Sequence, residues 1–226
     1  MPDKPHYHGH RKRLRERFLN AGPEALADYE LLELILFGSF PRGDVKPIAK
    51  ALLARFGSFA EVVNADPKDI QAVPGMGEAG ATALKVVRAA ALRMMQDGIM
   101  KRPVVSSWQA LTDYCRASMA SEKIEQFRIL FLNRRNELIA DEVQQTGTVD
   151  HTPVYPREVI KRALELGATA LILVHNHPSG DPEPSKDDIE ITREVIDAGE
   201  KMDIVVHDHV IVARGGISSF RAMGLL

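Results

Sequence analysis

The first hundred residues repeat short apolar stripes at helical spacing. Leu14 and Phe18 stand four residues apart in a run that is otherwise strongly basic, which is typical of a helix with one buried face. Asp28 can cap a second helix, whose apolar residues recur three and four positions apart. Further helices are predicted over residues 45–55, from 66 onward and over 78–95, with a Gly- and Pro-containing loop at 37–44.

The second half of the chain alternates strands with helices. After a predicted helix over residues 108–119, an alternating run at 125–132 and a turn at 133–136 lead into a returning strand over 137–148. The remaining elements are expected as helix, strand, helix and strand, beginning at residues 156, 170, 186 and 204. This mixed order indicates an α/β layered domain.

Gly98 and Pro103 mark the boundary between these halves. The sequence therefore predicts a helical module over residues 1–100 and an α/β domain over 103–226. Residues 1–102 hold 16 Lys and Arg against 12 Asp and Glu, a net charge of +4, whereas 103–226 hold 13 against 19, a net of −6. A mildly basic front half and an acidic back half suggest different partners for the two units.

Composition excludes several classes of protein. The apolar stretches are far shorter than the about 20 residues that a bilayer span needs, so no membrane partner is expected. The first residues lack the apolar core of a signal peptide, which predicts a cytoplasmic protein. The single cysteine, Cys115, excludes an internal disulfide framework and a multi-cysteine zinc site. A metal would have to be held by His, Asp or Glu.

The candidate chemistry lies in one loop that follows a predicted buried strand. His175 and His177 leave that strand two residues apart, so their imidazoles point to the same side and can share one metal ion. A Pro- and Gly-rich segment then returns the chain to a helix start at Ser185, with Asp188 on the first turn. Two imidazoles and one carboxylate, with a fourth position left to water, form the ligand set of a catalytic zinc site.

Each part of this pattern also has a purely structural interpretation. Ser185 and Asp188 fit a helix capping box, in which an acidic residue follows the cap by three positions. A His-x-His pair is usually two polar residues at a strand end. The chain contains a second such pair, His207 and His209, which sits among valines with no acidic helix start at short range. We interpret that second pair as structural. The first pair is distinguished by its combination with Ser185 and Asp188 after a further seven residues.

The spacing HxHx7SxxD resembles the JAMM motif of MPN-type zinc metallopeptidases, and its surroundings are similar to the bacterial RadC group. The similarity extends over essentially the whole chain and includes residues 13–18, 44–47, 127–133, 147–148, 154–159 and 173–180. It implies a helical module followed by a JAMM/MPN, cytidine-deaminase-like α/β domain. It also implies a hydrolase of peptide or isopeptide bonds, with His175, His177 and Asp188 as ligands of Zn2+.

The resemblance further implies a catalytic glutamate and serine. A carboxylate upstream of the motif takes the proton of the attacking water and hands it to the leaving amine. The family pattern favours Glu125, at the start of the first strand, and Glu142 on the returning strand is the alternative. Ser185 resembles the family serine that donates a hydrogen bond toward the tetrahedral oxyanion.

Residues 73–77, Val-Pro-Gly-Met-Gly, lie between two predicted helices and resemble a helix-hairpin-helix. In that motif the glycine turn and the next helix start offer backbone N–H groups to a DNA phosphate. Gly75 and Gly77 in the turn, and Lys85 and Arg88 on the next helix, are then candidate nucleic-acid contacts. Glu78 departs from the motif, because DNA binders usually carry Lys or Arg nearby, and a structural helix hairpin is the alternative.

Two functions follow from these features. The first is a zinc hydrolase with a protein or peptide substrate, and the second is a DNA-associated protein whose zinc site is structural or vestigial. They use different halves, so both can hold for one chain. Other zinc chemistries fit less well. A nucleobase deaminase has His-x-Glu and a later Cys-x-x-Cys, whereas this chain has His-Asn-His and a single cysteine, and no His-Glu-x-x-His helix is present.

Overall fold

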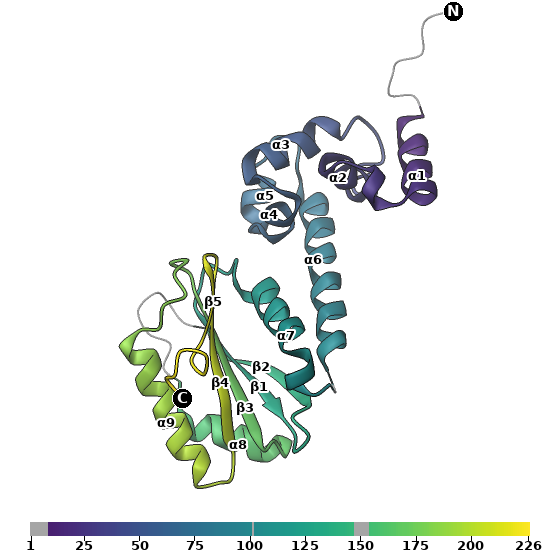
Figure 1. Cartoon of the computed structure of the whole chain (residues 1–226). Helices are drawn as coiled ribbons and strands as arrows, with labels where there is room; N and C mark the ends of the chain where they lie inside the picture. Colours follow the sequence, from purple (N-terminus) through teal and green to yellow (C-terminus); the bar gives the residue numbers. More distant parts are fainter. Residues whose placement is uncertain (1–8, 101, 147–153) are drawn as a thin grey trace, which may run out of the picture. The chain divides into compact units, whose positions relative to one another are not determined.

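The computed structural model describes residues 9–100, 102–146 and 154–226, and it divides the chain into two compact units (Figure 1). The first unit ends at Ala91 and the second begins at Leu92, within the long helix α6 (Glu78–Ile99). The boundary expected from the sequence lies further along the chain, near residues 98–103. The observed and expected boundaries differ because Met95 and Ile99, in the last turns of α6, pack into a core of the second unit.

The first unit consists of short helices around one apolar core, in which Leu32, Leu52 and Leu84 are fully buried. Its helices are α1 (His10–Ala21), the 3₁₀ helix η1 (Pro23–Ala25), α2 (Asp28–Leu36), α3 (Lys46–Phe56), α4 (Phe59–Asn64), α5 (Pro67–Gln71) and the first part of α6. The prediction that Asp28 caps α2 is wrong, because Ala27 holds the cap position. The Glu30 carboxylate closes this helix start by accepting a hydrogen bond from the Ala27 N–H at 3.1 Å.

Part of the basic run in α1 stabilises the first unit itself. The Arg11 guanidinium lies 4.7 Å from the centre of the Phe37 ring. It also donates hydrogen bonds to the carbonyl oxygens of Phe40, at 2.6 Å, and Gly43, at 3.0 Å. Because Phe40 and Gly43 belong to the loop after α2, Arg11 fixes that loop against α1.

The second unit is a five-stranded mixed sheet with helices on both faces (Figure 1). The strand order is β2-β1-β3-β4-β5, in which β3 and β4 run parallel and all other neighbours run antiparallel. The elements are α7 (Val104–Met119), β1 (Gln126–Leu132), β2 (Leu138–Thr146), α8 (Pro156–Leu166), β3 (Ala170–His177), α9 (Lys186–Glu200), β4 (Val205–Ala213) and β5 (Gly216–Ser219). The predicted helical module followed by an α/β domain is confirmed. The end of the expected returning strand, at residues 147–148, lies outside the described residues.

Each face of the sheet has its own core. Leu130 and Leu132 of β1 pack with α7, whereas Ile129 and Phe131 point to the opposite face, which α8 and α9 cover. β1 is therefore buried on both sides, because it lies between β2 and β3 with helices above and below. Within the described residues, no helix combines the length and the apolar composition that crossing a membrane requires.

A buried ion pair connects β1 with β2 beneath α7. The Arg128 Nη1 donates to both carboxylate oxygens of Asp141, at 2.8 and 3.0 Å, and Tyr114 of α7 donates its hydroxyl to the same carboxylate. The Asp141 side chain is only 1% exposed. Removing one partner of such a pair leaves the other charge uncompensated in the core.

We therefore expect Asp141→Asn to lower the free energy of unfolding by about 3–5 kcal/mol, measured by chemical denaturation. The control is Glu158→Gln, which removes one partner of the exposed Arg157–Glu158 pair and should cost less than about 1 kcal/mol. Equal effects of the two substitutions would contradict a structural role for the buried pair.

Candidate metal centre

The site begins where β3 ends. His175 is paired on one side with Phe127 of β1 and on the other with Ile211 of β4, so its backbone is fixed by two neighbouring strands. His177 is the last residue of the strand and projects to the same face two positions later. The His175 side chain is 1% exposed and that of His177 is 17% exposed. One imidazole is thus enclosed, while the other can be reached from solvent.

The loop after His177 is tied to the turn between β4 and β5. The Gly215 N–H donates to the Gly180 carbonyl oxygen at 2.9 Å. A Cβ at position 215 would lie 2.6 Å from that oxygen, so the close approach requires glycine. This contact fixes the path by which the chain returns from β3 to the start of α9.

Ser185 and Asp188 form the capping box that the sequence suggests. The Asp188 N–H donates to Ser185 Oγ at 3.1 Å, and the Ser185 N–H donates to Asp188 Oδ2 at 2.7 Å. The Ser185 hydroxyl also donates to Asp188 Oδ2, at 2.6 Å. The cap does not compete with the metal interpretation, because the same contacts hold the Asp188 carboxylate opposite the two histidines.

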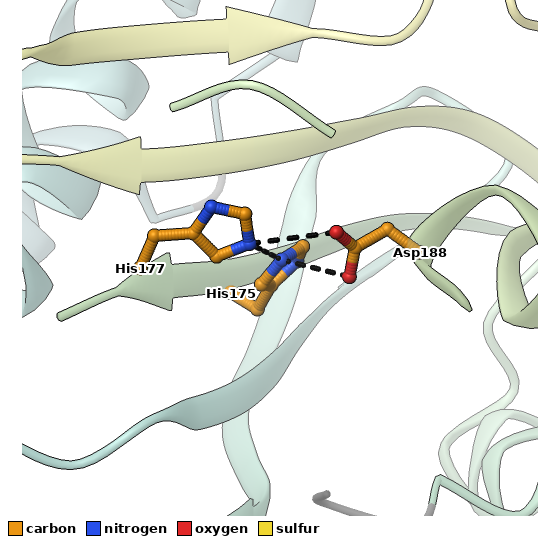
Figure 2. A group of neighbouring side chains, drawn as sticks. All are labelled: His175, His177 and Asp188. Carbon is orange, nitrogen blue, oxygen red and sulfur yellow. Dashed lines mark hydrogen bonds and ion pairs between the residues drawn. The ribbon is translucent and has the colours of Figure 1, made fainter. Parts of the chain in front are cut away.

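Three candidate ligands converge at this point (Figure 2). His175 Nε2 lies 2.9 Å from His177 Nε2 and 3.1 Å from Asp188 Oδ1, and His177 Nε2 lies 3.4 Å from Asp188 Oδ2. Zinc–nitrogen bonds of about 2.0–2.1 Å in a tetrahedral site place neighbouring ligand atoms about 3.3 Å apart. The observed separations are close to that value, so the residues fit a zinc ion.

The hydrogen bond of His177 Nδ1 determines which ring nitrogen carries the proton. His177 Nδ1 lies 2.8 Å from the Asp181 carbonyl oxygen. A carbonyl can only accept, so Nδ1 carries a proton, and in the neutral ring Nε2 presents its lone pair to Asp188 and His175. A nitrogen lone pair aimed at a carboxylate leaves a place for a cation between them.

The electrostatics of the cluster also favour positive charge. When His177 is protonated, its hydrogen bond with Asp188 stabilises that form and raises the pKa of His177, although burial opposes this shift. Burial alone would raise the pKa of Asp188, but hydrogen bonds with His175 and His177 outweigh it and hold the pKa far below its usual range. Asp188 is therefore ionised at neutral pH.

Sequence reasoning missed a contact to His209. Its fully buried ring lies between those of Phe127 and Phe220, and its Nε2 is 2.8 Å from His175 Nδ1. Burial, followed by the charge of His175, holds the pKa of His209 well below the usual value. His207 instead contacts the Asn136 side chain at 2.7 Å. The second pair thus lies outside the group of candidate ligands among the described residues, but one of its members contacts a candidate ligand.

The structure separates the two candidate glutamates. Gln126 N–H donates to the Asn176 side-chain oxygen at 2.8 Å, and the Asn176 amide donates to the Ile124 carbonyl at 3.2 Å. These bonds hold Glu125 level with the end of β3. Its negative charge adds to that of Asp188 in raising the pKa of His177.

Glu142 is engaged elsewhere on the sheet. Its two carboxylate oxygens accept from the guanidinium of Arg162 on α8, at 2.6 and 2.8 Å. This bidentate pair lowers the pKa of Glu142.

In the first unit, the residues proposed for nucleic-acid contact lie around the turn between α5 and α6. The Lys85 ammonium donates to three carbonyl oxygens at the end of α4, at 2.6, 3.0 and 3.2 Å, and Arg88 Nε donates to the Asn64 side chain at 2.8 Å. An ammonium has three N–H groups, so this cap uses all of them. Gly75 has φ +85° and Gly77 precedes the first residue of α6.

Comparisons with known proteins agree with the fold. The second unit contains a RadC-like JAB domain, matched over residues 105–225. An N-terminal domain described as UPF0758 N-terminal matches residues 8–82. A UPF0758 protein of Rhodobacter capsulatus is 60% identical over 213 residues, which cover 94% of this chain and 100% of that protein. The chain therefore belongs to the UPF0758 family of RadC-like JAB-domain proteins, and the resemblance to the RadC group is confirmed.

We expect the purified chain to hold about one equivalent of zinc, because the donor set matches a three-ligand zinc site. His175→Ala and Asp188→Ala should each reduce the bound zinc sharply in elemental mass spectrometry. His207→Ala is the matched control, since it removes a histidine that contacts Asn136 instead of the cluster. Full zinc occupancy in both ligand variants would contradict the assignment.

Proposed function

We propose that this chain is a zinc-dependent metallohydrolase that cleaves a peptide or isopeptide bond in a protein or peptide substrate. The observation that carries the proposal is the convergence of two imidazole nitrogens and an ionised carboxylate at the end of β3. Membership of a JAB-domain family supports a hydrolytic role for that arrangement.

When bound, zinc lowers the pKa of a coordinated water toward about 7 and polarises a scissile carbonyl. His175, His177 and Asp188 would hold the ion. Glu125, which is half-buried and whose charge acts on His177, would receive a proton and return it to the leaving amine. Glu142 is a weaker candidate, because its carboxylate is already bound at both oxygens by Arg162.

Ser185 would assist by donating its hydroxyl to the oxyanion of the tetrahedral intermediate. The hydroxyl currently donates to Asp188 Oδ2. To serve the substrate it must rotate about its Cα–Cβ bond, and Asp188 would keep its hydrogen bond from the Ser185 backbone N–H. The exposed position of Ser185 permits that approach.

We expect Glu125→Gln to retain zinc and lose turnover by about 10²–10⁴-fold, because glutamine is similar in size but cannot accept the proton. Turnover would be measured on the zinc-loaded protein with quenched fluorescent peptides and an isopeptide-linked analogue. Glu142→Gln is the control and should keep its activity. Loss of turnover in Glu142→Gln alone would assign the base to that residue, and no cleavage by the wild type would contradict the proposed hydrolase.

We also propose that the first unit associates with DNA through the turn between α5 and α6. The supporting observation is the open space beside Gly77, where an added Cβ would meet no atom within 4 Å, next to the start of the 22-residue helix α6. A phosphate can therefore approach the backbone N–H groups there. Lys85 is unsuited to such a contact, because its donors cap α4.

Gly77→Ala tests this contact without large strain, since the added methyl group points into open space. We expect it to weaken binding of duplex or branched DNA in low-salt fluorescence anisotropy, because the methyl hinders the phosphate. Gly98→Ala, at the other end of α6 and equally open, is the control and should bind as the wild type does. No DNA binding by the wild type at low salt would remove this second function.

A further inference from the structure

The Thr192 hydroxyl on α9 has two hydrogen-bond partners but only one proton to donate. Its Oγ1 lies within hydrogen-bond distance of the Asp188 backbone carbonyl oxygen and of His209 Nδ1. The carbonyl can only accept, so the Thr192 hydroxyl donates to it and must accept from His209. The opposite direction would leave two acceptor oxygens facing each other. His209 therefore carries a proton on Nδ1.

The next step follows from the enclosure of His209. The ring is 0% exposed and lies against the aromatic rings of Phe127 and Phe220, so it is neutral and holds only that one proton. Its Nε2 is then an acceptor, 2.8 Å from His175 Nδ1. His175 must supply the proton from Nδ1, which leaves its Nε2 bare toward His177 and Asp188.

We infer that Thr192 and His209 are positioning residues that hold His175 in the tautomer able to ligate a metal ion. The inference rests on the proposed zinc site and concerns how that site is prepared. Four groups take part in order, namely the Asp188 carbonyl, the Thr192 hydroxyl, the His209 ring and the His175 ring. The relay begins on the backbone of one ligand and ends on the side chain of another.

The relay is needed at His175 and not at His177. A backbone carbonyl determines the proton position on His177 directly, since it offers no choice of direction. A histidine partner can either donate or accept, so His209 alone would leave the tautomer of His175 undetermined. Thr192 removes this ambiguity. Without its oxygen, His209 would place its proton on Nε2, and His175 would then carry a proton on the nitrogen that faces the cluster.

The test is the zinc dissociation constant of Thr192→Val, measured on the full chain by competition with a chromophoric chelator. Valine keeps the shape of threonine and removes the acceptor, and we expect the dissociation constant to rise about 10–100-fold. Thr192→Ser restores the hydroxyl and should return the affinity to near the wild-type value. His207→Gln changes the neighbouring histidine, which contacts Asn136, and should have no effect.

Two further measurements separate positioning from a general loss of structure. Thermal unfolding of each metal-free variant reports whether it is folded, and the ring ¹⁵N shifts of the zinc-loaded wild type report the protonated nitrogen of His209. We expect protonation at Nδ1. Wild-type affinity in a folded Thr192→Val, or protonation of His209 at Nε2, would overturn the inference while the zinc site stands. Failure of the wild type to bind zinc would overturn the proposed function and this inference together.

Discussion

The candidate metal centre depends on one constraint, which is that the two imidazole nitrogens facing the carboxylate must both be free of protons to bind a cation. A histidine meets this condition only when its other nitrogen donates to something that cannot donate back. For His177 that acceptor is the Asp181 carbonyl, and for His175 it is His209 with its own proton held on Nδ1 by Thr192. The loop after β3, strand β4 and the start of α9 each contribute to meeting the condition. The candidate site therefore includes these elements as well as the three candidate ligands.

The position of β3 between β1 and β4 makes these contributions possible. Alternate residues of β3 serve different purposes, because His175 and His177 face the cluster while Asn176 points away from it. The Asn176 side chain binds the chain on both sides of Glu125. The residue between two candidate ligands thus orients the candidate base, and a substitution there would affect Glu125 without removing a candidate ligand.

The sequence predicts the convergence of the three candidate ligands well, and the contacts that support them poorly. Spacing along one chain segment is enough to place His175, His177 and Asp188 together, because a strand end and a helix start are local features. His209 belongs to the next strand, and its contact with His175 depends on the register of β3 with β4, which no motif contains. The parallel connection through α9 and the shared face of alternate residues would have indicated it. The same reason applies to Lys85, since helical spacing does not reveal that α4 ends beside it.

The capping and metal interpretations of Ser185 and Asp188 coexist, because the hydrogen bonds that Ser185 donates to the carboxylate both go to Oδ2 and leave Oδ1 open. Asp188 Oδ2 accepts from both the backbone N–H and the hydroxyl of Ser185, whereas Oδ1 faces His175 Nε2. Hydrogen bonds to one carboxylate oxygen draw negative charge toward it and fix the plane of the group. Oδ1 is then the oxygen available to a cation, held in direction by the cap. The acidic residue at the third position of α9 therefore caps the helix and, through the same hydrogen bonds, orients a candidate ligand.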